Sequence, residues 1–114
     1  MKRTFDTLEE RLDYIEFREN LLYAKSPVDR VFFENELTEP EYKAIMDVMD
    51  DCRQKLANGE GVSNASFEQA IYAIVPEDKH DYHMCEALAK AFAEEHRWEE
   101  VFPALYGDME KYNG

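Results

Sequence analysis

The segment KHDYHMC, residues 79–85, concentrates side chains that could do chemistry. It holds two of the chain's three histidines and one of its two cysteines. Imidazole nitrogens and thiolates bind zinc, and a cysteine beside a histidine can act as a catalytic nucleophile. The segment therefore poses three alternatives: a metal site, a catalytic pair, or the first turn of an ordinary helix.

Helical geometry favours the third alternative for this segment. His80 and His83 are three residues apart and would share one side of a helix. Cys85 would lie about 200° around the helix from His83, on the stripe that Leu88 and Phe92 share. We therefore expect Cys85 to pack in the core and the two histidines to face solvent.

A structural zinc site needs four ligands, usually supplied as two pairs. The remaining candidates, Cys52 and His96, are distant in the sequence and would have to meet the segment by tertiary folding. A small zinc-binding protein that uses His80, His83 and either Cys85 or Cys52 stays open as an alternative. The main expectation is that the chain has no metal and no other cofactor.

Signals for catalysis are also weak elsewhere in the chain. His83 lies on the wrong side of the helix to activate Cys85, and no glycine-rich segment nearby offers backbone donors for an oxyanion. The chain contains no phosphate-binding loop, no GxSxG and no HExxH motif. We therefore expect no enzymatic activity.

The charge balance is the most pronounced global feature of the sequence. Twenty-six acidic residues stand against 13 lysines and arginines, for a formal net charge of -13. Such a chain lacks the positive charge that direct nucleic-acid binding requires, and it is repelled by anionic membranes. It attracts basic surfaces instead, so we expect a protein partner with a basic surface, no direct nucleic-acid binding and no membrane binding.

Size and composition predict one helical domain. The 114 residues suit a single domain over 1–114, and no apolar run approaches the length of a membrane span. The start, MKRTFDTLEERLDY, becomes acidic before any apolar signal-peptide region, which indicates a cytoplasmic protein. Capping signals and 3–4 spacings of apolar residues predict an all-α fold, with five or six short antiparallel helices in one compact bundle.

Cap residues place most of these helices. Thr7 precedes a helix starting at Leu8, Ser26-Pro27 opens a second, and Thr38-Glu39-Pro40-Glu41 is a capping box for a third. The third helix carries an apolar stripe and ends at Asn58-Gly59, before a loop over 58–66. We expect Ser66 to cap a helix that ends at Pro76, and residues 84–98 to form another helix. Pro103 should begin or kink a last helix. The apolar pattern of that helix is Trp98, Val101, Phe102, Leu105, Tyr106 and Met109.

The first helix has an apolar seam on one side. Its members are spaced by three and four residues and are interrupted by one carboxylate: Phe5, Leu8, Leu12, Ile15, Glu19 and Leu22. Such a seam needs an apolar partner. A possible homodimer through Leu8, Leu12, Ile15 and Leu22 follows from this pattern.

Three acidic rows are the candidate partner-binding residues. Helical spacing puts their carboxylates side by side, so that each row could imitate a phosphate strand and dock into a basic groove. The rows are Glu9, Glu10, Asp13 and Glu16 near the start; Asp47, Asp50 and Asp51 in the third helix; and Glu94, Glu95, Glu99 and Glu100 near the end. The alternative is that each row is only a solvated helix face.

Aromatic residues are numerous for so small a core, with seven Phe, seven Tyr and one Trp. Several fall off the expected apolar stripes, so we expect some to be exposed as interface anchors. These residues are Tyr14, Phe17, Tyr23, Phe33, Tyr72, Tyr82 and Tyr106.

The chain resembles the small helical YhaI-like proteins of Gram-positive bacteria, whose function is uncharacterised. The resemblance lies in RLDYIEFRENLL, in DRVFFENELTEPEYKAIMDVMDDCRQKL and in HRWEEVFPALYGDMEKY. It implies an all-helical fold that self-associates, and it implies no activity or site residue. The loop NGEGVSN and the strong acidity depart from the family pattern.

The leading functional hypothesis is a non-catalytic, acidic protein-binding module. We expect an inhibitor or adaptor of the kind carried by phages and mobile elements, which covers a basic nucleic-acid-binding surface of a bacterial protein, as an anti-CRISPR or other anti-defence protein would. One alternative is a YhaI-like cytoplasmic housekeeping protein that acts as a homo-oligomer. The other is the small zinc-binding protein described above.

Overall fold

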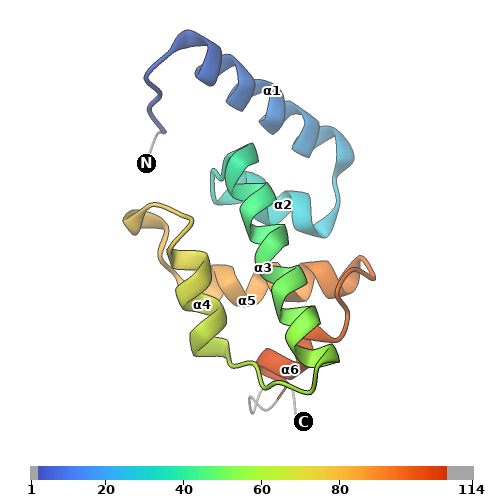
Figure 1. Cartoon of the computed structure of the whole chain (residues 1–114). Helices are drawn as coiled ribbons and strands as arrows, with labels where there is room; N and C mark the ends of the chain where they lie inside the picture. Colours follow the sequence, from blue (N-terminus) through green and yellow to red (C-terminus); the bar gives the residue numbers. More distant parts are fainter. Residues whose placement is uncertain (1–2, 108–114) are drawn as a thin grey trace.

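The structure, a computed structural model, describes residues 3–107, and this part of the chain is all-α (Figure 1). No β-strand occurs within residues 3–107, which confirms the expected compact all-α architecture. The helices are α1 (Leu8–Ala24), α2 (Pro27–Glu34), α3 (Glu39–Ala57), α4 (Asn64–Tyr72), α5 (Tyr82–Glu94) and α6 (Val101–Tyr106), with a short 3-10 turn η1 (Glu77–Lys79) before α5.

Helices α1, α2 and α3 begin where the capping signals of the sequence predict. The Thr7 side chain accepts a hydrogen bond from Glu10 N, and the Ser26 side chain accepts one from Asp29 N. At α3 the capping box is complete: Thr38 Oγ1 accepts from Glu41 N, and Glu41 Oε1 accepts from Thr38 N at 2.8 Å. Each bond satisfies a backbone N–H that the first helical turn leaves without a partner.

Helix α5 is the central element of the core. Seven of its 13 residues are buried, and it packs against α2, α4 and α6. Cys85, Leu88 and Phe92 are fully buried, as their shared stripe predicts. The apolar stripe of α3 is also inward, with Ile45 and Met49 fully buried, so these two helices hold the body of the molecule together.

The bounds predicted for two helices are wrong. Helix α4 starts at Asn64, because the Ser63 side chain caps it by accepting from Ser66 N, so Ser66 lies inside the first turn rather than at the cap; the helix ends at Tyr72 rather than at Pro76. Helix α5 starts at Tyr82, because Asp81 accepts from His83 N, and it ends at Glu94 rather than at residue 98. In both helices a polar side chain nearer the N-terminus takes the cap position.

The proline of the last helix lies near its start. Pro103 is the third residue of α6, where a missing N–H costs no intrahelical bond. Val101, Leu105 and Tyr106 are buried, while Met109, the last member of the predicted apolar pattern, lies outside the described residues. None of the helices within 3–107 is both long enough and apolar enough to cross a bilayer.

Helix α1 lies at one end of the molecule and packs mainly on α2 (Figure 1). Only Phe17 and Leu21 of its 17 residues are buried. The Phe17 ring meets the Tyr42 ring of α3 edge-on, with 5.8 Å between ring centres, and the Arg18 guanidinium lies 3.9 Å from the centre of the Phe33 ring of α2. These contacts fix which side of α1 faces the body.

A long-range hydrogen bond joins α2 to the end of α5. Glu95 Oε2 accepts from the backbone N–H of Val28, a fully buried residue in the first turn of α2, at 2.6 Å. Glu95 Oε1 also lies 3.6 Å from Arg97 Nη1, and the Arg97 guanidinium lies over the Phe92 and Trp98 rings. A carboxylate at a helix N-terminus satisfies an unpaired donor and also opposes the positive end of the helix dipole.

We expect Glu95→Ala to lower the free energy of unfolding by about 1–3 kcal/mol, because the substitution leaves the buried Val28 N–H without an acceptor. Urea unfolding followed by circular dichroism measures the effect. Glu94→Ala is the matched control, since Glu94 is an exposed neighbour, and it should change the stability by no more than about 0.5 kcal/mol. Equal effects of the two substitutions would contradict the capping role of Glu95.

Candidate functional site

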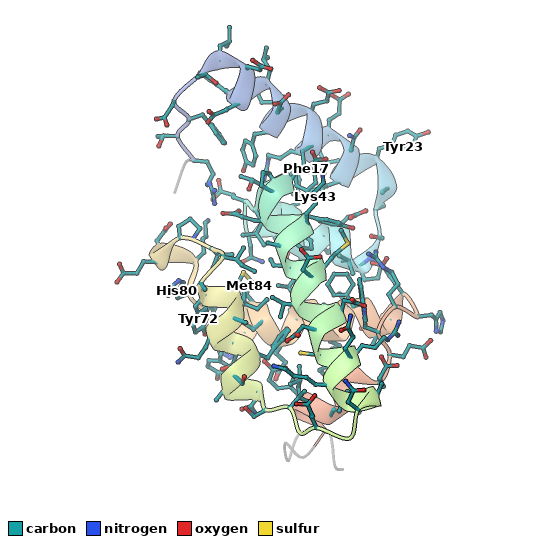
Figure 2. All side chains as sticks on the ribbon, in the orientation of Figure 1. Phe17, Tyr23, Lys43, Tyr72, His80 and Met84 are labelled. Carbon is teal, nitrogen blue, oxygen red and sulfur yellow. The ribbon has the colours of Figure 1, made fainter. Side chains whose placement is uncertain are left out.

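The outward side of α1 carries an apolar seam, formed by Leu8, Leu12, Ile15 and Leu22. These side chains are 70%, 54%, 50% and 54% exposed, and neighbouring Tyr23 is 89% exposed. Figure 2 shows Phe17 between α1 and α3, while Tyr23 points away from the body. At 3.6 residues per turn, Phe17 lies about 180° around the helix from Leu8, so α1 has two opposite apolar sides and the body covers one of them.

An acidic flank, formed by Glu9, Asp13 and Glu16, runs along one edge of the apolar seam. These residues follow the i, i+4, i+7 spacing of one helix side, and Glu10 is adjacent to them. All four are exposed, and no Lys, Arg or His nitrogen within residues 3–107 lies within 4.0 Å of their carboxylates. The structure therefore leaves the first predicted acidic row open to solvent.

A basic flank, formed by Arg11 and Arg18, runs along the opposite edge of the apolar seam. Together with Arg3 it lines a hollow of about 520 Å³ next to Tyr14. Arg18 Nη1 donates to the Tyr14 hydroxyl and to the Phe33 carbonyl, so this side chain is held against the body. Arg11 is exposed, and within residues 3–107 it lies in no ion pair.

The second predicted row, on α3, is partly occupied by bonds within its own helix. Asp51 Oδ2 lies 3.1 Å from Lys55 Nζ, and Asp50 Oδ2 accepts from Gln54 Nε2 at 2.9 Å. Asp47 is exposed. Pairs of this i,i+4 type on a helix surface are weak, so a stronger partner could displace them.

Two of the four residues in the third predicted row, Glu95 and Glu100, connect different helices. Glu95 holds the start of α2, Glu99 lies 3.4 Å from the ring of His96, and Glu100 receives two hydrogen bonds from the Arg53 guanidinium of α3. The hydrogen bond from Arg53 holds the pKa of Glu100 below its usual range. Glu94 is exposed and lines a hollow of about 400 Å³ together with Lys25, Ser26, Arg30 and Lys90.

The two histidines of the KHDYHMC segment bond to different partners in the structure. His80 Nε2 lies 2.9 Å from the Tyr72 carbonyl, where it donates a hydrogen bond, and its ring stacks on the Tyr72 ring (Figure 2). His80 thus satisfies the end of α4, whereas His83 pairs with Asp81 in the first turn of α5. Sequence spacing could not show this, because His80 precedes the helix rather than lying within it.

The structure offers neither a zinc ligand set nor a reactive thiol in the described part of the chain. No group of three or more His, Cys, Asp or Glu side chains within residues 3–107 is placed to hold a metal ion. Cys52 and Cys85 are both buried free cysteines. Burial raises the pKa of the Cys85 thiol to about 12, so the nucleophilic thiolate is disfavoured there.

Comparisons with known proteins add no family assignment. No protein-family model, no curated protein and no solved structure matches the chain. The resemblance to YhaI-like proteins therefore stays a prediction from the sequence.

The candidate functional site is the outward side of α1, where the apolar seam lies between an acidic and a basic flank.

Proposed function

We propose that this protein is a non-catalytic protein-binding module whose acidic α1 surface docks onto a basic surface of a bacterial protein. The observation that carries the proposal is the exposure of Glu9, Glu10, Asp13 and Glu16 with no cationic partner within residues 3–107. Carboxylates that are not neutralised within the protein keep their charge available for a basic partner.

The attachment of α1 to the body supports this docking. The helix is capped at Thr7 and held to the body by Phe17, Leu21 and the Arg18 contacts, so its backbone is ordered before binding. An ordered backbone lowers the cost of association, although the exposed carboxylate side chains still lose rotamer freedom when they bind. A row of acidic residues whose Cβ atoms lie about 5–6 Å apart presents a line of negative charge to a groove that otherwise accommodates nucleic-acid phosphates.

The biological role that fits such docking is inhibition. A partner whose nucleic-acid groove is covered by this protein cannot bind its DNA or RNA, which is how an anti-CRISPR or other anti-defence protein of a phage would act. The net charge of -13 supports this role, because it provides long-range attraction to basic grooves and raises the association rate at low salt.

The test uses a variant in which α1 loses three of these charges: Glu9→Gln, Glu10→Gln and Asp13→Asn. Wild type and variant are immobilised and exposed to a bacterial lysate, and retained proteins are identified by mass spectrometry. We expect a basic protein that wild type retains and the variant loses. Its retention should fall steeply between about 50 mM and about 500 mM salt, and excess duplex DNA should compete for it.

A matched control removes the same number of charges elsewhere, through Glu60→Gln, Glu77→Gln and Asp78→Asn, at three exposed positions outside α1. This control should retain the partner as wild type does. Circular dichroism verifies that both variants fold. Equal loss in both variants, or retention that is indifferent to salt and DNA, would refute docking through α1.

A further inference from the structure

The apolar seam of α1 has the spacing of a two-helix interface. Leu8, Leu12, Ile15, Glu19 and Leu22 follow one another at intervals of 4, 3, 4 and 3 residues. This places Leu12 and Glu19 at a positions of a heptad repeat and the other three at d positions. The seam is exposed in the monomer. Within residues 3–107, nearly all other large apolar side chains lie in the core or pack against it.

The charged residues beside the seam select a partner and an orientation. In the same heptad phase, Glu9 and Glu16 occupy e positions, and Arg11 and Arg18 occupy g positions. In a parallel pair, a g residue faces the e residue five positions later on the other helix, so Arg11 faces Glu16 of a second copy, twice by symmetry. In an antiparallel pair, equal flanks face each other and like charges meet. A second copy in parallel orientation is thus complementary to α1 on both edges.

We infer that two copies of this chain associate through their α1 helices, side by side and parallel, with the apolar seams in contact. The body lies on the opposite side of α1, at Phe17 and Leu21, so the two bodies project away from the two-fold axis. At the edge of the seam, the Arg18 guanidinium lies over the Phe33 ring and bonds the Phe33 carbonyl of α2, so this edge is partly occupied by the body.

The size of the seam sets the strength of this dimer. A 17-residue helix is about 25 Å long, and a pair of such helices buries less than the about 800 Å² per partner of a standard interface. The helix is already folded on the body, which reduces the ordering cost. We therefore expect a reversible dimer with a dissociation constant on the order of 10–100 μM.

Glu19 weakens the dimer and provides a sensitive probe of it. Its a position places it opposite Glu19 of the second copy, where two carboxylates share one layer of the seam. Like charges at this distance repel each other and lose water on association. A neutral apolar residue at position 19 would complete the seam, so the sequence itself limits how tightly two copies associate.

Sedimentation equilibrium from about 1 μM to about 1 mM protein tests the association. We expect Leu12→Asp to raise the dissociation constant at least about tenfold and Glu19→Leu to lower it at least about tenfold, because these changes disrupt and complete the seam. Tyr82→Asp, at an exposed aromatic residue outside α1, is the matched control and should leave the constant unchanged. A wild-type chain that stays monomeric at about 1 mM, or that forms trimers or tetramers, overturns the inference.

Charge reversal tests the orientation. In the parallel dimer, Arg11→Glu puts a new carboxylate against Glu16 of the second copy and should weaken association about tenfold, whereas Arg11→Glu combined with Glu16→Arg should restore it. In an antiparallel dimer, the single substitution would place the new carboxylate near Arg18 of the second copy and tighten association. Tightening by Arg11→Glu, or failure of the double variant to recover, overturns the parallel arrangement.

Salt separates this inference from the proposed function. Two copies with a net charge of -13 each repel one another, so screening should strengthen the dimer between about 50 mM and about 500 mM salt. Docking to a basic partner should weaken over the same range. The two proposals can therefore fail independently.

Discussion

The rotation of α1 about its own axis is the constraint on which the functional surface depends. Phe17 and Leu21 are buried against the body, and the guanidinium of Arg18 is fixed by the Phe33 ring, the Phe33 carbonyl and the Tyr14 hydroxyl. These contacts turn the opposite apolar side, with its acidic and basic flanks, toward solvent. If the helix were rotated by half a turn, the leucine seam would be buried, and Phe17 and Leu21 would be exposed.

The sequence predicts local structure well where a side chain caps the backbone within three residues. Thr7, Ser26 and Thr38 each bond the N–H three positions later, so the starts of α1, α2 and α3 follow from short patterns. It fails at α4, because Ser63 and Ser66 are both acceptable caps and the sequence does not show that Ser63 accepts from the Ser66 N–H, which starts the helix one turn earlier. Where two cap residues lie within one turn, the local pattern alone does not fix the boundary.

The candidate site was predictable only in part, for a similar reason. Spacing identifies the seam of α1, yet it does not show that the body covers the opposite side, where Phe17 falls off the predicted stripe and is buried. The role of Glu95 is invisible in the sequence, since its acceptor function at Val28 joins residues 67 positions apart. The acidic rows look alike in the sequence, but in the structure they differ: Glu95 and Glu100 of the third row bond to other helices, and the first row is in no ion pair within residues 3–107.

The two surfaces of α1 are neighbours, and this links their proposed uses. Glu16 borders the seam and would face Arg11 of a second copy, so self-association removes its charge from the acidic surface. Asp13 lies about 60° further around the helix, and Glu10 lies closer still to the body side, so both stay accessible in a parallel dimer. A basic partner that binds through Asp13 and Glu10 can therefore bind each copy of the dimer, whereas one that needs Glu16 must compete with the second copy. The balance between these states follows protein concentration and salt, because the apolar seam and the net charge act in opposite directions on association.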